Sequence, residues 1–353
     1  MLSEVELLKA LVAIPSVSGD EEPIARFVEA TVRAWGLAVV RDETGVKVSV
    51  DSGRPGRSLA LISHLDVVPP GSGWTRDPFV PVVEGGRLYG RGSGDAKASV
   101  AAMLTAAHDF SVTNRPSGGR LVVVLGLGEE TKNTSMGRAI ASLPRFDAAV
   151  VGEPTNLDIA IAQRGLMMVD LVASGDQRHA GYAADGDFTN AITGLAQDLV
   201  RLPTLLTERD HPLLGRATVT ATMVEAGVSR NVTPPVAKAV LDIRSTPSWS
   251  HQEIGASLRS ALQSEVVITS ERLVPCETPA DSRLVADAHR IRPSAKAFGS
   301  PTCSDWVFVR DIDTIKCGPG TSRLSHTADE WVLVSEVTEA RVFYRALTEA
   351  YLR

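Results

Sequence analysis

The sequence has little of what several protein classes depend on. Its 353 residues contain 3 cysteines, at positions 276, 303 and 317, which form neither a disulfide framework nor a Cys-x-x-Cys metal knuckle. The net charge is −6 and no Lys/Arg-rich run occurs, so binding to a nucleic-acid backbone is not expected. Apolar runs such as Leu121 to Leu125 are strand-sized, and the acidic, helically periodic start is unlike a signal peptide. We therefore expect a cytoplasmic protein with free thiols that does not enter a membrane.

What is present is the composition of a globular chain with a full core. Hydrophobic residues make up 44% and charged residues 22%. In the first part of the chain, helical spacing alternates with short apolar runs typical of buried strands. The pattern predicts helices at 2–13, 22–35 and 96–109, and strands at 46–50, 59–63, 121–125 and 148–152. This alternation predicts an α/β fold with a mixed, mainly parallel sheet flanked by helices.

Near residue 165 the pattern changes. The following segments predict a strand at 166–173, a helix at 189–202, strands near 217–224 and 236–243, and a helix at 251–264. Strand, helix, strand, strand, helix and strand in this order are typical of a small α+β domain with one exposed sheet face. Helical spacing returns at 281–291. We therefore predict one α/β domain, residues 1–164 and 276–353, interrupted by an inserted α+β domain at 165–275.

His64 and Asp66 are the first candidates for chemistry. Both follow an apolar strand, and residues i and i+2 of an extended segment point to the same side. An imidazole that binds metal usually has its other ring nitrogen held by a carboxylate, which Asp66 is placed to supply. A hydrogen-bonded loop pair is the alternative interpretation of these two residues taken alone.

Asp95 lies in the glycine-rich segment 90–97, directly before a predicted helix. The glycines allow a tight turn, after which the carboxylate is placed to cap the helix. A phosphate cradle is the competing functional interpretation. It is disfavoured because the segment lacks the Gly-x-x-x-x-Gly-Lys-Ser/Thr order and because an aspartate would repel phosphate. A plain helix cap remains open for Asp95 considered alone.

Further acidic residues follow the next apolar runs. Glu129 and Glu130 come after the strand at 121–125, and Glu153 after the strand at 148–152. Adjacent carboxylates beside a core strand are costly unless a cation neutralises them, although a solvated turn would also accommodate them. Adjacent side chains diverge, so one can ligate a metal while the other faces a bound water. His326 lies in a glycine-rich loop before a short strand.

These residues indicate a metal site when they are taken together. His64, Asp95, Glu130 and Glu153 all lie at or beyond the expected carboxyl ends of strands, the edge where open α/β sheets form their sites. Two divalent ions would be balanced by the three carboxylates and a bridging hydroxide, with two neutral imidazoles completing the site. Mixed histidine and carboxylate ligands favour zinc, with cobalt as a substitute.

The motifs resemble those of the dinuclear zinc metallopeptidase family that contains acetylornithine deacetylase, succinyl-diaminopimelate desuccinylase, aminoacylase and carboxypeptidase G. They run in the family's order over nearly the whole chain. The matching segments are Ser63-His64-Leu65-Asp66-Val67-Val68-Pro69, Gly90-Arg91-Gly92-Ser93-Gly94-Asp95-Ala96-Lys97, Gly128-Glu129-Glu130, Gly152-Glu153-Pro154-Thr155 and Ser325-His326-Thr327-Ala328-Asp329-Glu330. The resemblance implies two bound zinc ions and hydrolysis of a linear amide bond.

The resemblance also implies a role for each site residue. Asp95 would bridge the two ions, and Asp66 would orient His64. Glu129 would be the general base that takes a proton from the bridging water and passes it to the leaving amine. The remaining ligands would divide between the ions as His64 with Glu153, and Glu130 with His326.

The inserted segment resembles the family's lid and dimerisation domain, which implies a homodimer formed through residues 165–275. In Arg178-His179-Ala180-Gly181-Tyr182, His179 would reach the partner subunit's site and stabilise the oxyanion. Asn231 and Arg244 lie in segments that would bind substrate, with Arg244 gripping a carboxylate. The chain departs from the family near Ala183 and Ala184, where relatives often carry a proline.

The substrate is predicted from two further segments. Residues 300–306 and 315–323 resemble the acetylornithine deacetylase branch. This implies removal of an acetyl or succinyl group from the α-nitrogen of ornithine, in arginine biosynthesis. The open alternatives are an amino-group-carrier-protein lysine or ornithine hydrolase, succinyl-diaminopimelate desuccinylase, a dipeptidase, and a non-catalytic binding or dimerisation module.

Overall fold

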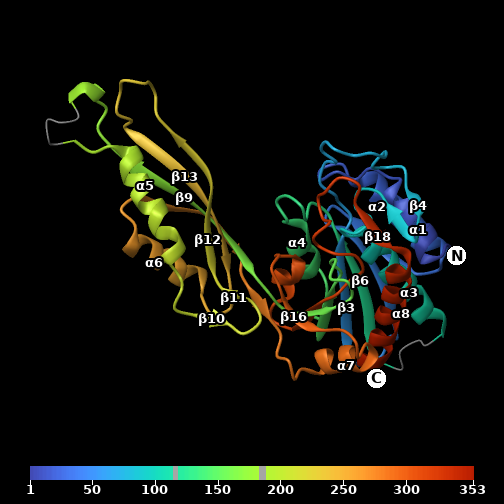
Figure 1. Cartoon of the computed structure of the whole chain (residues 1–353). Coiled ribbons are helices and arrows are strands. Elements are labelled where there is room, and N and C mark those ends of the chain that lie inside the picture. The colour runs from blue at the N-terminus through green and yellow to red at the C-terminus, as the bar shows by residue number, and fades with distance from the viewer. Residues whose placement is uncertain (114–117, 183–187) are drawn as a thin grey trace. The chain divides into compact units, whose positions relative to one another are not determined.

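The computed structural model describes residues 1–113, 118–182 and 188–353, and the chain forms two compact units (Figure 1). The first unit comprises residues 1–161, 278–298 and 304–353, and the second comprises 162–277 and 299–303. The sequence predicted an inserted domain at 165–275. In the structure the second unit also takes up the short segment 299–303. Ala183 and Ala184, where the chain departs from the family pattern, lie outside the described residues.

The first unit is built around a large sheet with helices on both sides (Figure 1). Its helices are α1 (Glu4–Val12), α2 (Glu22–Ala34), α3 (Lys97–Thr113), α4 (Ser135–Ala141), α7 (Arg283–Ile291), α8 (Val334–Tyr351) and the 3₁₀ turn η3 (Asp305–Val309). Its strands are β1 (Ala38–Asp42), β2 (Gly45–Asp51), β3 (Ser58–His64), β4 (Val82–Glu84), β5 (Arg87–Tyr89), β6 (Arg120–Gly126), β7 (Ala148–Val151), β17 (Asp313–Lys316) and β18 (Trp331–Leu333), while β8 (Ile159–Gln163) and β16 (Ala297–Ser300) lead into the second unit.

The strand order of this sheet confirms the predicted fold class. From β1 to β8 it runs β1-β2-β6-β3-β7-β17-β8. The central pairs β6–β3, β3–β7 and β7–β17 are parallel, whereas β1–β2, β2–β6 and β17–β8 are antiparallel. Parallel strands need crossover connections; α3 lies in the connection from β3 to β6 and α4 in that from β6 to β7, while the long connection from β7 to β17 includes the second unit and α7. The sheet is therefore mixed, and its central strands, which the candidate site follows, are parallel.

Burial on both faces explains why the central strands read as continuous apolar runs. Every residue of β3 is buried, as is every residue of β7. Leu59 and Leu61 face a core that they share with α1, α3 and α8, while Ile62 points away from it, toward the other face. A strand buried on both sides has no polar face, so alternation disappears from the sequence. This rigid sheet fixes the positions of the loops that follow its strands.

The second unit has a four-stranded antiparallel sheet in the order β12-β13-β9-β14. Its regular elements are β9 (Gly165–Ser174), η1 (Ala180–Tyr182), α5 (Ala191–Arg201), η2 (Leu202–Thr204), β10 (Asp210–His211), β11 (Gly215–Arg216), β12 (Thr218–Ala226), β13 (Val236–Ser245), α6 (His251–Ala261), β14 (Glu265–Leu273) and β15 (Cys276–Glu277). Alternate residues of β9 are buried, and Met167, Val169 and Leu171 pack with Leu195 of α5 and Leu258 of α6. The other residues of the alternation are only partly buried, as expected for a sheet with one covered face.

The sequence analysis missed α8, an 18-residue helix at the C-terminal end of the chain. Its apolar positions follow helical spacing, and Val337, Phe343 and Leu347 are buried against the core. The helix begins after Leu333 without a side-chain cap, so the capping residue that usually marks the start of a helix in a sequence is absent. The strands β1 and β8 also escaped prediction. In β1 no residue is fully buried, so its apolar signal is weak.

Candidate metal site

The register of the parallel strands brings the candidate ligands to one edge of the sheet. His64 at the end of β3 is paired with Gly126 at the end of β6, and Ile62 is paired with Val151 at the end of β7. Glu130 and Glu153 follow β6 and β7 within a few residues. Because the carboxyl ends of these strands are level, the loops that follow them meet, as the sequence predicted.

Asp95 and His326 reach the same place through a smaller sheet. The three-stranded sheet β18-β5-β4 pairs Trp331 with Tyr89. Asp95 follows β5 through the glycine-rich turn, and His326 precedes β18. Pairing of these short strands therefore brings together two loops that are more than two hundred residues apart in the chain.

His64 is the most deeply buried of the candidate ligands, with 1% of its surface exposed. Its Nδ1 lies 3.0 Å from the main-chain oxygen of Asp66 and 3.5 Å from the Asp66 carboxylate. Its Nε2 faces outward to the other ligands, 3.4 Å from Asp95 Oδ1 and 3.8 Å from Glu153 Oε1. Burial lowers the pKa of the imidazole, but the surrounding carboxylates outweigh burial and raise that pKa well above 6.5.

Asp66 organises the loop after β6 as well as His64. It is fully buried, and its two oxygens accept the main-chain N–H groups of Glu129 and Glu130, each at 3.0 Å. The Ser18 hydroxyl donates a third hydrogen bond at 2.7 Å. Burial raises the pKa of Asp66, but His64 and these donors lower it further, to about 2. The charged carboxylate thus fixes the backbone of the two adjacent glutamates, whose side chains belong to the site. No role for Ser18 was predicted from the sequence.

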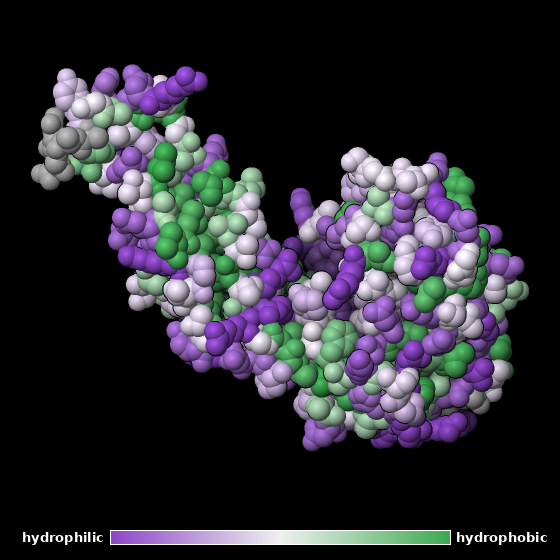
Figure 2. All heavy atoms as spheres, viewed as in Figure 1, coloured by the Kyte–Doolittle hydropathy of each residue, from purple (hydrophilic) through white to green (hydrophobic). Residues whose placement is uncertain are grey.

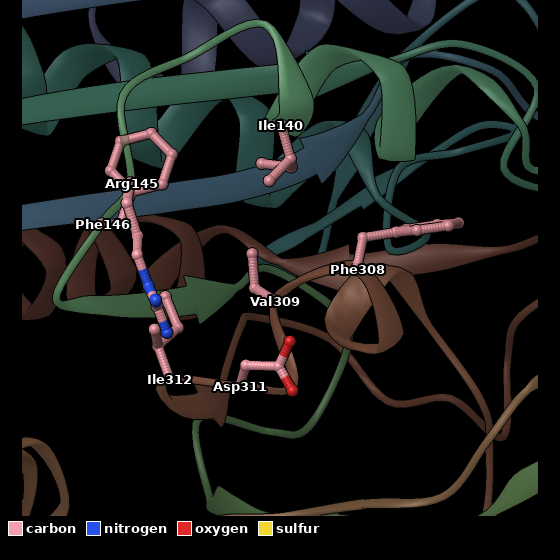
Figure 3. A pocket seen from close by; sticks show the side chains of 7 residues that line it. All are labelled: Ile140, Arg145, Phe146, Phe308, Val309, Asp311 and Ile312. Atoms are coloured by element: carbon pink, nitrogen blue, oxygen red, sulfur yellow. The ribbon is translucent and has the colours of Figure 1, made fainter.

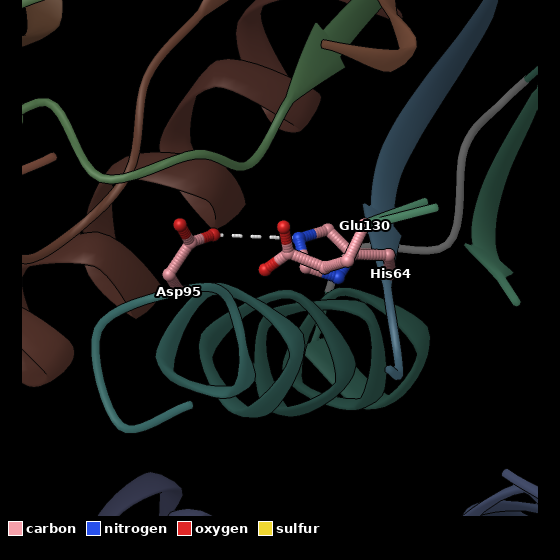
Figure 4. A group of neighbouring side chains, drawn as sticks. All are labelled: His64, Asp95 and Glu130. Atoms are coloured by element: carbon pink, nitrogen blue, oxygen red, sulfur yellow. Dashed lines mark ion pairs between the residues drawn. The ribbon is translucent and has the colours of Figure 1, made fainter. Parts of the chain in front are cut away.

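Asp95 lies between the two histidines. Its Oδ1 faces His64, while its Oδ2 lies 3.9 Å from Nε2 of His326. The same Nε2 lies 2.9 Å from Glu130 Oε2. Figure 4 shows the side chains of His64, Asp95 and Glu130 pointing toward one another, and one ligand atom from each of the three lies within 4.8 Å of the others. The five predicted ligands are therefore gathered, linked pairwise through His64, Asp95 and His326.

Two buried polar atoms of the predicted ligands have no hydrogen-bond partner among the described residues. They are Nε2 of His64 and Oε1 of Glu153, which face each other across 3.8 Å. Buried polar atoms without a partner are rare, and each calls for an explanation such as a bound ion. An imidazole nitrogen and several carboxylate oxygens are a ligand set suited to zinc-like divalent ions. The residues present therefore fit a metal.

The acidic residues repel one another as they stand. Burial and the neighbouring Asp95 carboxylate raise the pKa of Glu153 to about 8. Burial, with the charges of Glu153, Asp305 and Glu130, raises the pKa of Glu129 well above 4.5. Divalent cations beside such groups reverse this and favour the charged forms. Glu129 is thus a carboxyl that readily holds a proton, next to the candidate ligands.

Asp305 is a site residue to which the sequence analysis gave no role. It lies in the segment 300–306, is fully buried at the start of η3, and has a pKa that burial raises to about 7. Its charge in turn raises the pKa values of Glu129 and Glu153. No short-range pattern points to it, because nothing in its own segment shows that it lies near residue 129.

The three residues predicted to act from the inserted segment all lie in the second unit. His179 is exposed and pairs with Val232 in an isolated antiparallel bridge, next to the exposed Asn231. Its Nδ1 accepts the N–H of Gly181, which leaves Nε2 for an external partner. Arg244 is on β13, where its guanidinium binds both oxygens of Asp242, at 2.7 and 3.0 Å. The catalytic and substrate-binding roles of these residues stay predictions.

The first unit also contains a cavity away from these residues. It has a volume of about 220 Å³ and lies between α4 and η3 (Figure 3). Its lining combines five apolar side chains with one arginine and one aspartate: Ile140, Arg145, Phe146, Phe308, Val309, Asp311 and Ile312. None of the candidate ligands lines it, and its single carboxylate does not make a metal site. Across the described residues, no helix has both the length and the apolar character needed to span a bilayer.

Comparison with known proteins gives the same answer as the geometry. The sequence pattern of peptidase family M20/M25/M40 matches residues 60–350. A succinyl-diaminopimelate desuccinylase of Methylorubrum extorquens is 31% identical over 390 aligned residues, which cover 99% of this chain and 99% of that protein. The match therefore extends over the whole chain, including the inserted unit.

Solved structures show the same fold at low sequence identity. Aminopeptidase PepT from Bacillus cereus ATCC 10987 superimposes with a TM-score of 0.82 at 19% identity, covering 99% of this chain and 98% of its own. The Bacillus subtilis YXEP protein, described as a dinuclear metal-binding peptidase, gives 0.77 at 16% identity, with 99% and 97% covered. With its gathered histidines and carboxylates, the chain belongs to peptidase family M20/M25/M40 and is a metal-dependent hydrolase of amide bonds.

Proposed function

We propose that the chain binds two divalent ions, zinc in the first place and cobalt as a substitute, and uses them to remove an acyl group from the nitrogen of an amino acid. The observation that carries the proposal is Asp95, whose two oxygens face two different histidines. His64 and Glu153 would complete one ion's ligands, and Glu130 and His326 the other's. The charge of two divalent ions would be balanced by the three clustered carboxylates together with one hydroxide.

The ions, when bound, supply Lewis acidity that activates water near neutral pH and polarises the acyl carbonyl. Glu129 would accept the proton that water loses as its oxygen bonds to the carbonyl carbon. The same proton would then pass to the nitrogen as the C–N bond breaks, giving a carboxylic acid and an amine; transfer of the acid's proton to the amine then leaves a carboxylate and an ammonium ion. Asp66 holds the backbone of Glu129 in place by accepting a hydrogen bond from the main-chain N–H of Glu129. His179 would donate a hydrogen bond to the oxyanion, and Asn231 and Arg244 would contact the substrate.

For the substrate, we propose the N-succinyl amide of diaminopimelate. This choice is supported by the Methylorubrum extorquens desuccinylase, which matches the chain from end to end. The sequence analysis preferred N-acetylornithine, because residues 300–306 and 315–323 resemble the acetylornithine deacetylase branch. N-acetylornithine is therefore the second candidate. Both substrates carry an acyl group on the nitrogen of an amino acid that has a further amine and a carboxylate.

A substrate panel tests this proposal. Zinc- or cobalt-loaded protein would be assayed with N-succinyl-diaminopimelate, N-acetylornithine, N-succinylornithine and dipeptides. We expect the highest kcat/KM for N-succinyl-diaminopimelate. A value at least tenfold higher for N-acetylornithine would move the chain to the second candidate. No turnover of any acylated amino acid or dipeptide by the metal-loaded protein would overturn the proposed activity.

We also propose that two copies associate through the second unit, as the resemblance to a dimerisation domain implies. The strand β12 is at an edge of its sheet and is almost wholly exposed. It carries two large apolar side chains, Met223 and Val224, that are 67% and 59% exposed. Figure 2 shows apolar side chains gathered over α5 and the neighbouring strands of this unit. An exposed edge strand with apolar side chains is a template on which another chain can pair.

Charge on this edge is expected to break the dimer. Val224→Lys places a cation where the apolar edge would be buried, so we expect the mass in solution to change from two chains to one. The matched control is Val112→Lys, since Val112 is 65% exposed on α3 of the first unit. Light scattering after size exclusion measures both. A wild-type monomer, or a dimer unchanged by Val224→Lys, would contradict the proposed interface. The cytoplasmic location stays a prediction.

The raised pKa values at the site predict how the metal-free protein responds to pH. Glu153, with a pKa of about 8, and Asp305, with a pKa of about 7, keep their protons in the folded chain at pH values where an unfolded chain has released them. Above about pH 4.5 the folded state therefore binds more protons than the unfolded state, and the free energy of unfolding falls as pH rises toward 8.

Thermal unfolding measures this effect. Chelated protein is expected to have a lower Tm at pH 8 than at pH 5.5, and metal-loaded protein is expected to show a smaller difference, since cations favour the charged carboxylates. A metal-free protein that gains stability from pH 5.5 to pH 8 would show that the carboxyls are not crowded as the structure has them.

A further inference from the structure

A buried ion pair links the loops that carry two of the candidate ligands. Arg91 and Glu330 are each 1% exposed, and Nη1 of Arg91 donates to Oε2 of Glu330 at 2.7 Å. Arg91 follows β5, in the loop that leads to the candidate ligand Asp95. Glu330 precedes β18, in the loop that contains the candidate ligand His326. Neither side chain reaches toward the reacting groups in the account above. Two charges removed from water are costly, so a structure that keeps them needs a reason.

Glu330 holds the turn that carries Asp95. Its Oε1 accepts the N–H groups of Gly94 at 2.9 Å and Asp95 at 3.0 Å, and its Oε2 accepts that of Gly92 at 3.0 Å. The glycines make this approach possible. Gly92 has φ +79°, and a Cβ there would lie 2.5 Å from a methyl group of Val67, while a Cβ at Gly94 would lie 3.4 Å from Oε1 itself. Three N–H groups on one carboxylate leave the backbone at Asp95 little freedom.

Arg91 holds the loop that carries His326. Its Nη2 donates to the main-chain oxygens of Pro70 at 3.2 Å and His326 at 3.4 Å. His326 has φ +66°, a left-handed conformation that a residue with a side chain seldom adopts without support from its surroundings. The planar guanidinium can hold the carboxylate and these carbonyls at once, which an ammonium group cannot.

We propose that Arg91 and Glu330 form a positioning pair that sets the separation of Asp95 and His326, and thereby the affinity of the metal position these two share. Pairing of β5 with β18 brings the two loops together, and the ion pair adds a side-chain connection: Glu330 binds the backbone of one ligand, and Arg91 binds the backbone of the other. The inference rests on the proposed function, because it assumes that Asp95 and His326 hold an ion. The other metal position, with His64 and Glu153, would also have Asp95 as a ligand, but not His326.

The test is the metal affinity of Glu330→Gln, measured by competition with a chromophoric chelator and by the absorption spectrum of bound cobalt. The amide keeps the size of the side chain but loses the charge and one acceptor oxygen. We expect cobalt and zinc to bind about 10- to 100-fold more weakly at one position, with an altered cobalt spectrum, while the other position changes less. Arg91→Lys keeps the charge but loses the fork and is expected to weaken the same position.

A second ion pair of the first unit, in which the glutamate is buried and the arginine partly exposed, gives the control. Glu4 is 6% exposed and its Oε2 accepts Nη1 of Arg341 at 2.7 Å, on α1 and α8. Glu4→Gln is expected to lower Tm without changing metal affinity or the cobalt spectrum. If Glu330→Gln does not fold, Arg91→Lys, which leaves the charge balance intact, decides the question by the same measurements.

The outcomes separate this inference from the proposed function. A wild-type chain that binds no metal overturns both. A wild-type chain that binds metal, with Glu330→Gln and Arg91→Lys showing wild-type affinity and spectrum and only a lower Tm, overturns the positioning role alone. Weaker binding at one position in these variants, but not in Glu4→Gln, supports it.

Discussion

Glu129→Gln is expected to lower kcat by about 10²- to 10⁴-fold, the usual contribution of a general acid and base. The amide has nearly the same shape as the carboxylate but cannot accept the proton of water or return it to the leaving nitrogen. Asp66 contacts the backbone N–H of residue 129, not its side chain, so the loop should keep its place. The loss should therefore fall on kcat, with metal content unchanged. Activity and metal content of the same preparation are the two measurements.

An exposed glutamate of the first unit is the control for this result. Glu43 pairs with Arg138 on the surface, where such contacts contribute little. Glu43→Gln should keep wild-type kcat and metal content. If Glu129→Gln retained wild-type kcat, Glu129 would not be the base. If it lost its metal, residue 129 would be a ligand and the division of roles between Glu129 and Glu130 would be wrong.

Removal of metal is expected to abolish turnover and to lower thermal stability. Without metal ions, the carboxylates of Asp95, Glu130 and Glu153 are crowded together, with two histidines and, at Glu153, the charge of Lys316 to offset them. Ions that bind only the folded chain add RT ln(1 + [L]/Kd) to the free energy of unfolding, about 2.7 kcal/mol at a concentration 100 times Kd. Chelation should therefore lower Tm and reduce activity to background, and zinc or cobalt should restore both.

A chelator can also lower activity or Tm by effects other than metal removal, so a control variant is needed. His64→Ala removes a candidate ligand whose buried Nε2 has no hydrogen-bond partner in the described part of the chain. The variant should have a low Tm that added zinc raises less than it raises the Tm of the wild type. Full activity in the presence of a chelator that removes all zinc from solution would contradict the metal-dependent mechanism. Inert protein after zinc is restored would favour the non-catalytic module that the sequence analysis left open.

The parts of the site that follow buried strands were predictable from sequence. His64, Glu130 and Glu153 each come after an apolar run, and parallel pairing levels the ends of such runs. Asp95 was recognisable from its glycine-rich turn, although a helix cap explained it equally well by itself. The register of β3, β6 and β7 brings the first three together, and the pairing of β5 with β18 adds Asp95; sequence patterns do not contain these registers.

Other parts depend on contacts between distant segments and were missed for that reason. Arg91 and Glu330 are 239 residues apart, and neither has a local pattern that shows it is buried. Asp305 affects Glu129 only through the folded core. The substrate prediction also depended on short stretches of the chain. Segments of seven and nine residues favoured N-acetylornithine, whereas the relative aligned over 99% of the chain is a succinyl-diaminopimelate desuccinylase. Short segments do not define the shape of an acyl pocket.

Anomalous diffraction at the zinc edge, from crystals of the zinc-loaded protein, tests the central claim most directly. We predict two peaks, one beside His64 Nε2 and Glu153, the other beside His326 Nε2 and Glu130, with Asp95 between them. A single peak within this group would reduce the site to one ion. Zinc-loaded crystals with no peak among these five side chains would contradict the account.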